Sequence, residues 1–126
     1  MFQALRLSQA VFALAYLTSI VSAKCYAPDG HEITRPEAGP CSDDPNDPLS
    51  NICCNVNRKY APGTFKDAAQ VRDTCLPNGM CQNWSLDSEG NDFYQWGRDY
   101  CTESDWNSGK CLNVCTQTAG DVRTPV

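Results

Sequence analysis

The stretch TCLPNGMC at residues 74–81 decides how the middle of this chain folds. Its Asn78-Gly79 pair lies between two short apolar segments and favours a tight β-hairpin turn, because Asn and Gly accept the positive φ that such turns need. Each arm carries a cysteine, at Cys75 and Cys81. We therefore expect a short hairpin that disulfides connect to the rest of the chain.

Cysteines mark the rest of the sequence as well. The 126 residues contain nine, all after residue 24: Cys25, Cys41, Cys53, Cys54, Cys75, Cys81, Cys101, Cys111 and Cys115. His31 is the only histidine and no two cysteines have the C-x2-C spacing, so the usual zinc ligands are missing. The pattern predicts disulfides in an oxidising compartment, with neither a metal nor a cofactor.

The first 23 residues read as a secretory signal peptide. Arg6 precedes an apolar run from Ala10 to Val21, and Val21-Ser22-Ala23 has the small residues of a cleavage site. The alternative is a membrane anchor, but a span needs about 20 apolar residues and this run is shorter. We expect a secreted, extracellular chain with a cysteine-rich domain at residues 24–115 and a disordered tail at residues 116–126.

The charge balance excludes one class of partner. Without Arg6, nine Lys and Arg residues face fifteen Asp and Glu residues. An acidic chain repels phosphate backbones, so we expect no nucleic-acid partner. Long apolar stretches are also absent after residue 24, and we expect no membrane span there. Disulfides must then supply the stability that a small core cannot.

Local patterns predict mixed secondary structure. Five prolines make residues 26–50 irregular. Thr64 is a candidate N-cap for a two-turn helix at residues 65–72, and Thr102 for a short helix at residues 103–114. The aromatic run from Phe93 to Tyr100 predicts a strand. The predicted fold class is a small disulfide-rich, loop-dominated α+β domain, with a short hairpin and one or two short helices.

The order of the first six cysteines is similar to that of knottins and hevein-like domains, which also run single, single, double, single, single. Neighbouring cysteines on an extended backbone point to opposite sides, so the Cys53-Cys54 pair reaches in two directions. The resemblance implies pairing of first with fourth, second with fifth and third with sixth. These bridges would be Cys25–Cys54, Cys41–Cys75 and Cys53–Cys81.

The spacing of the last three cysteines leaves their pairing open. Cys111 and Cys115 are four residues apart, so a bridge between them is allowed, and so is a bridge from Cys101 to either one. One of the nine must stay without a partner inside the chain. It is a candidate for a dimer through an intermolecular disulfide, or for a partner that this chain lacks.

A second resemblance covers residues 25–115. The chain resembles uncharacterised secreted cysteine-rich proteins of filamentous fungi in a series of short motifs. These are CYAPDG (25–30), PC (40–41), CC (53–54), CLPNGMC (75–81), GRDYCT (97–102), Trp106 and the step from Cys111 to Cys115. This resemblance implies an extracellular or cell-surface domain of unknown activity. The chain departs from the family pattern in the twenty residues 55–74, which carry four of the nine basic residues.

Two polar motifs are candidates for sites. Asn83-Trp84-Ser85 is a sequon that predicts a glycoprotein with a glycan on Asn83, the alternative being a polar turn. The acidic residues 87–92 alternate like calcium ligands, but without the rest of an EF-hand they favour a solvated loop.

The sequence favours binding over catalysis. His31 lies in a proline-rich loop with no serine motif around it, and a free cysteine would have no obvious base, so we expect no enzyme. Aromatic residues are candidates for a surface that stacks on sugars, although in a small domain they more often form the core: Trp84, Tyr94, Trp96 and Trp106. We expect an effector-like or cell-surface recognition protein that binds an extracellular protein or cell-wall glycan through disulfide-fixed loops at residues 26–50 and 55–74. The alternatives are a chitin- or glucan-binding module and a knottin-type inhibitor of proteases or channels.

Overall fold

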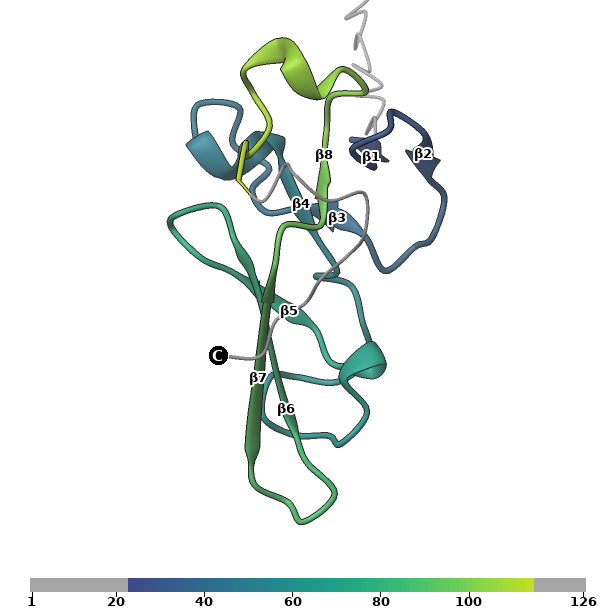
Figure 1. Cartoon of the computed structure of the whole chain (residues 1–126), viewed down its shortest axis with the longest axis vertical. Coiled ribbons are helices and arrows are strands. Elements are labelled where there is room, and N and C mark those ends of the chain that lie inside the picture. Colours follow the sequence, from purple (N-terminus) through teal and green to yellow (C-terminus); the bar gives the residue numbers. More distant parts are fainter. Residues whose placement is uncertain (1–22, 115–126) are drawn as a thin grey trace, which may run out of the picture.

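The computed structural model describes residues 23–114, which form two antiparallel sheets (Figure 1). The first sheet has five short strands in the order β2 (Glu32–Ile33), β1 (Cys25–Tyr26), β8 (Tyr100–Cys101), β4 (Ile52–Cys54) and β3 (Gly39–Pro40). The second has three strands in the order β5 (Asp73–Cys75), β6 (Cys81–Leu86) and β7 (Asp92–Gly97). In Figure 1 the first sheet occupies the upper part of the molecule and the long β6–β7 hairpin extends below it.

The predicted α+β class was wrong, because residues 23–114 contain only single 3-10 turns in place of helices. These turns are η1 (Pro48–Asn51), η2 (Ala68–Gln70) and η3 (Trp106–Ser108). The described domain is a small disulfide-rich, all-β structure. Residues 26–50 contain five prolines, which have no backbone N–H to donate. The three strands β1, β2 and β3 still form in or beside this segment, because each has only two residues and needs few donors.

The helix expected at residues 65–72 gives way to pairing with distant backbone. The Gly63 amide donates to the Trp84 carbonyl at 2.7 Å, and the Leu86 amide donates to the Phe65 carbonyl at 3.0 Å. The segment therefore runs beside β6 and closes only one turn, η2, which Asp67 caps by accepting from the Ala69 amide. Tertiary pairing has overridden local helix propensity.

The second expected helix, at residues 103–114, is also a single turn. Asp105 caps η3 by accepting from the Asn107 amide, and Gly109 ends the turn at a φ of 86°. The Cys101–Cys111 bridge closes this segment after only ten residues. The bridge and the glycine together keep the segment compact.

The hairpin at residues 74–81 is confirmed. Cys75 pairs directly with Cys81, the Gly79 amide donates to the Leu76 carbonyl at 2.9 Å, and Gly79 takes a φ of 86°. The strand expected from Phe93 to Tyr100 is divided between the two sheets. β7 ends at Gly97, and the chain crosses into the first sheet as β8.

Four disulfides connect these strands: Cys25–Cys53, Cys41–Cys75, Cys54–Cys81 and Cys101–Cys111. Only Cys41–Cys75 matches the pairing that the knottin-like order implies. Cys25 joins Cys53, and Cys54 joins Cys81, so the implied Cys25–Cys54 and Cys53–Cys81 bridges were wrong. The vicinal pair does reach in two directions, but the register of β4 between β3 and β8 decides which cysteine faces which partner.

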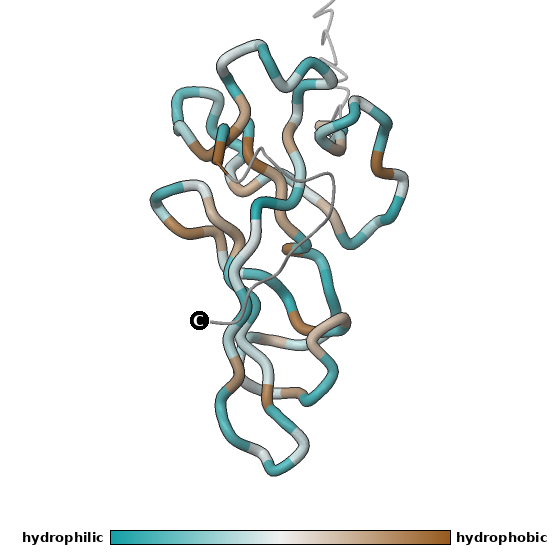
Figure 2. Tube along the Cα trace, viewed as in Figure 1, coloured by the Kyte–Doolittle hydropathy of each residue, from teal (hydrophilic) through white to brown (hydrophobic). Residues whose placement is uncertain are grey.

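The bridges form most of the core. Ile52, Cys54 and Cys81 are buried together, and Cys41, Leu49, Val56, Cys75 and Leu112 pack around them. Figure 2 shows hydrophobic positions in short, scattered segments instead of continuous runs. Each long-range bridge spans 27 to 34 residues and contributes about 3 to 4 kcal/mol in the chain-entropy model. Covalent links thus replace much of the apolar burial of a larger domain.

Several expectations lie outside the described residues. These are nearly all of the signal peptide, Cys115 with its possible pairings, and the tail at residues 116–126. Within residues 23–114 no helix has the length and apolarity to cross a bilayer. Four disulfides in so small a domain indicate an extracellular environment.

Candidate functional site

Three aromatic side chains form a stack on one face of the second sheet. Trp84 on β6 lies directly opposite Tyr94 on β7, and their ring centroids are 5.6 Å apart at an interplanar angle of 17°. Tyr94 and Trp96 are 5.8 Å apart at 16°. Nearly parallel rings at these distances are offset-stacked, so each ring covers only part of its neighbour. We call these three residues the aromatic stack.

Strand alternation places this stack on the outer face of the sheet. Along β6 the residues Cys81, Asn83 and Ser85 are buried, whereas Gln82, Trp84 and Leu86 are half-exposed. The register then places Gln82 beside Trp96 and Thr74 beside Gln82. The outer face thus combines ring surfaces with neutral polar side chains that can donate and accept hydrogen bonds.

Trp84 is fixed in its orientation from two sides. Its indole Nε1 donates to Asp92 Oδ1 at 2.9 Å. Gly63 lies against the ring, and a Cβ at that position would come within 2.7 Å of a ring carbon. Gly63 also has a φ of 74°, a conformation that other residues adopt at a cost. The glycine therefore permits a close approach that holds the indole in place.

Trp106 does not join the aromatic stack. It lies on η3 beside the first sheet, where its Nε1 donates to the Tyr26 carbonyl at 3.3 Å. The guanidinium carbon of Arg98 is 4.7 Å from the centroid of its ring. These contacts connect η3 to β1, so the structure gives Trp106 a packing role and brings together only three of the four aromatic candidates.

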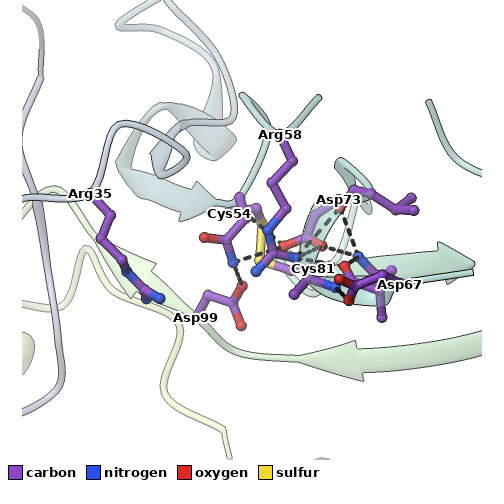
Figure 3. A network of polar contacts seen from close by, with 12 residues as sticks. Arg35, Cys54, Arg58, Asp67, Asp73, Cys81 and Asp99 are labelled. Atoms are coloured by element: carbon purple, nitrogen blue, oxygen red, sulfur yellow. Dashed lines mark hydrogen bonds and ion pairs between the residues drawn. A yellow bond between two sulfur atoms is a disulfide. The ribbon is translucent and has the colours of Figure 1, made fainter. Parts of the chain in front are cut away.

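The opposite face of the second sheet covers a buried polar network that the sequence patterns did not indicate. In Figure 3 the dashed contacts converge on Asp73, with Arg58 reaching toward it. Arg58 Nη1 is 3.5 Å from Asp73 Oδ1, and their side chains are only 10% and 2% exposed. Asp73 Oδ2 also accepts from the Asn55 amide at 3.0 Å.

Two asparagines complete this network. Asn83 Nδ2 donates to Asp73 Oδ1 at 2.9 Å, and Asn55 Nδ2 donates to Asp99 Oδ2 at 2.8 Å. Asp73 belongs to β5, Asn83 to β6, and Asn55 follows β4 directly, so the network ties both sheets to the segment at residues 55–74. Asp73 and Asn83 lie directly opposite each other on β5 and β6, and this register, which no sequence pattern shows, brings the network together.

The sequon at Asn83 does not fit a glycan. The Asn83 residue is 1% exposed, and its Nδ2, the atom that would carry the sugar, donates to the Ala68 and Val71 carbonyls at 3.1 and 3.0 Å. A glycan there would replace one of the two Nδ2 hydrogens that make these hydrogen bonds. Asn83 is therefore a buried part of β6, whereas Trp84 of the same sequon is half-exposed, and the glycan on Asn83 stays a prediction that this burial does not support.

The acidic loop at residues 87–92 is the turn between β6 and β7. Asp87 Oδ1 accepts from the Glu89 and Asn91 amides at 2.9 and 2.8 Å. These hydrogen bonds favour the ionised carboxylate and lower the pKa of Asp87 below its ordinary value, and the bond from the Asn91 amide has the largest effect. Asp87 thus organises the turn, as expected for a solvated loop.

The two loops expected to carry recognition meet at a cleft of about 350 Å³. Residues of both loops line it: Pro36, Glu37, Asn57, Arg58, Lys59, Ala69 and Gln70. The Asn57 amide donates to the Glu37 carbonyl at 3.0 Å and holds the loops together. The cleft therefore lies where the first loop meets the segment at residues 55–74.

The fold and these sites define a small disulfide-stabilised β-protein of extracellular type that carries an aromatic face and a polar cleft. No family model, curated protein or solved structure matches the chain. The resemblance to fungal secreted proteins stays a prediction, and function must be argued from geometry.

Proposed function

We propose that this protein is a secreted recognition module that binds an extracellular carbohydrate at the aromatic stack. The observation that carries the proposal is the offset stack of Trp84, Tyr94 and Trp96 on the half-exposed face of the second sheet. Sugar rings present apolar C–H faces together with hydroxyl groups. A face that combines ring surface with the polar side chains of Gln82 and Thr74 matches both.

Rigidity supports this function. The Cys54–Cys81 bridge holds the start of β6, while Asp92 and Gly63 fix the Trp84 indole. A preformed surface loses little conformational entropy when a ligand binds. The fifteen acidic residues of the chain disfavour anionic polysaccharides, so neutral or cationic glycans such as chitin, glucan or chitosan are the expected ligands.

The test compares two substitutions on the same strand. Trp96→Ala removes ring surface from the stack. Phe93→Ala removes an aromatic side chain that is also exposed, at 37%, but points to the other face of β7, because Phe93 is one residue from Tyr94 and three from Trp96. Binding to insoluble chitin, chitosan and β-glucan would be measured by pull-down and by tryptophan fluorescence.

We expect Trp96→Ala to weaken binding about tenfold, because one aromatic contact contributes roughly 1 to 1.5 kcal/mol. Phe93→Ala should bind like the unchanged protein. Retention on none of the polysaccharides would reject carbohydrate binding, and equal weakening by both substitutions would remove the aromatic stack as the site.

A second candidate is recognition of an extracellular protein at the cleft, as expected for an effector-like protein with disulfide-fixed loops. Its support is that both loops line one cleft with charged side chains of both signs, Glu37 and Lys59 among them. Lys59→Glu should abolish a protein complex isolated from extracellular fluid. The control is Lys66→Glu, which makes the same charge change outside the cleft, where the Lys66 Nζ donates to the Ser88 carbonyl. It should leave the complex intact. Two of the three bridges differ from the pairing that the knottin resemblance implies, so the knottin-type inhibitor has less support than these two candidates.

A further inference from the structure

Two of the four disulfides touch each other where the two sheets meet. Cys41 Sγ is 3.4 Å from Cys54 Sγ, although Cys41 is bonded to Cys75 and Cys54 to Cys81. The sulfurs of Cys41, Cys54 and Cys75 all lie within 4.8 Å of one another. Sulfurs this close can exchange bonds, since thiol–disulfide exchange needs only a thiolate beside a disulfide.

The backbone already places one pair of the opposite arrangement, Cys75 and Cys81, within disulfide range. Cys75 and Cys81 face each other across the β5–β6 hairpin, and facing residues of antiparallel strands have Cα separations of about 4.5 to 5.5 Å, inside the disulfide range. The Cys41 amide donates to the Ile52 carbonyl at 2.8 Å. Cys41 therefore lies opposite Ile52 on β4 and diagonal to Cys54. Diagonal residues are about 7 to 8 Å apart, so a Cys41–Cys54 bond draws β3 and β4 together locally, while the two sulfurs are already in contact.

We propose that these four cysteines form a disulfide-exchange site at which a thiol converts Cys41–Cys75 and Cys54–Cys81 into Cys41–Cys54 and Cys75–Cys81. An external thiolate attacks Cys75 Sγ, which forms a mixed disulfide and releases the Cys41 thiolate. The Cys41 thiolate attacks Cys54 Sγ, which forms the Cys41–Cys54 bond and releases the Cys81 thiolate. Cys81 then attacks the mixed disulfide at Cys75, forms Cys75–Cys81 and returns the thiol. Two disulfides are broken and two are formed, so the thiol acts as a catalyst and no net oxidation occurs.

Burial decides where such a thiol enters. Cys54 is 0% and Cys81 3% exposed, so their bond is closed to an external reagent, whereas Cys41 and Cys75 are only half-buried. Attack therefore begins at the Cys41–Cys75 bridge. The released Cys41 thiolate is already beside Cys54, and the second exchange is intramolecular.

The exchange changes what the bridges connect. In the described structure both bridges run from the β3–β4 region of the first sheet to the β5–β6 hairpin of the second. In the exchanged form each bridge stays within one sheet. Both disulfides between the sheets are lost, and polar contacts remain there, among them those between Asn55 and Asp73. A thiol thereby loosens the second sheet from the first.

The first experiment uses Cys75→Ser in the full chain with Cys115→Ser, so that Cys41 is left as the thiolate beside Cys54. Free thiols are blocked with a maleimide in mildly acidic guanidinium, which slows exchange and makes buried thiols accessible, and the labelled cysteines are located by peptide mass spectrometry. We expect label on both Cys41 and Cys81, because Cys41 displaces Cys81. The control combines Cys111→Ser with Cys115→Ser and keeps Cys75. It frees Cys101, whose sulfur does not belong to the group formed by Cys41, Cys54 and Cys75, and should carry label on Cys101 alone. Label confined to Cys41 in the first variant would overturn the proposal.

The second experiment needs no substitution. The unchanged protein is incubated with a substoichiometric amount of reduced glutathione, quenched with acid and mapped without reduction. We expect Cys41–Cys54 and Cys75–Cys81 peptides to accumulate while the total thiol stays constant. Only the original four bridges, or glutathione held on Cys41 or Cys75 without new pairs, would contradict the exchange. This experiment decides the matter if the Cys75→Ser variant does not fold.

Discussion

Replacement of Asp73 by Ala should be among the most destabilising single changes outside the cysteines. The Asp73 carboxylate accepts from Asn55, from Asn83 and from Arg58, and both partners of the ion pair are almost completely buried. Removal of one partner of a buried ion pair costs about 3 to 5 kcal/mol, because the remaining charge and the hydrogen-bond donors keep their desolvation cost. This is a large part of the roughly 5 to 15 kcal/mol by which small domains are stable.

Glu32→Ala is the matched control. Glu32 forms an ion pair with Lys24 at 3.4 Å, but the two side chains are 42% and 62% exposed, so its loss should cost at most about 1 kcal/mol. Urea unfolding with the disulfides intact, monitored by tryptophan fluorescence, gives the free energy of unfolding of both variants. We expect the dependence of this free energy on urea concentration to be the same in both. A loss for Asp73→Ala no larger than that for Glu32→Ala would refute the structural role of the network.

Three further predictions concern the second sheet and its turn. Gly63→Ala should lower the free energy of unfolding by about 1 to 3 kcal/mol and shift the tryptophan emission, because the added Cβ meets the Trp84 ring at a positive φ; an unchanged spectrum and stability would contradict this. Enzymatic removal of N-glycans from protein produced in a secreting eukaryotic host should leave its mass unchanged, because Asn83 is buried, and a mass loss that maps to Asn83 would contradict this prediction. Carboxyl titration by NMR should give Asp87 a pKa below its ordinary value. The contribution of Asp87 to stability is then complete above about pH 4 and is lost as the pH falls through the lowered pKa. A pKa at the ordinary value would contradict the hydrogen bonds that Asp87 accepts in the turn.

The parts of the fold that sequence predicts are those with local causes. The hairpin at residues 74–81 follows from Asn78-Gly79, whose conformational preference does not depend on distant residues. The opposite directions of Cys53 and Cys54 follow from strand alternation alone. The choice of Cys25 for Cys53 depends on how β4 pairs with β3 and β8, and these strands lie far apart in sequence.

The failures have a common physical origin. Thr64 and Asp67 are acceptable helix caps, but the backbone of this segment pairs with Trp84 and Leu86 on β6, which no local pattern shows. Likewise, the spacing of Trp84, Tyr94 and Trp96 predicts aromatic character but not a common face, because that depends on the β6–β7 register. Asn83 resembles a glycosylation site in sequence and is a buried donor in the structure.

The disulfide framework supports every other conclusion, because it sets the sheet junction and the position of the aromatic face. Its direct test is non-reducing peptide mapping of the oxidised protein with thiols blocked at harvest, using electron-transfer dissociation to separate the adjacent Cys53 and Cys54. The structure predicts Cys25–Cys53, Cys41–Cys75, Cys54–Cys81 and Cys101–Cys111. A Cys25–Cys54 bridge, with Cys53 bonded to Cys81, would contradict the account.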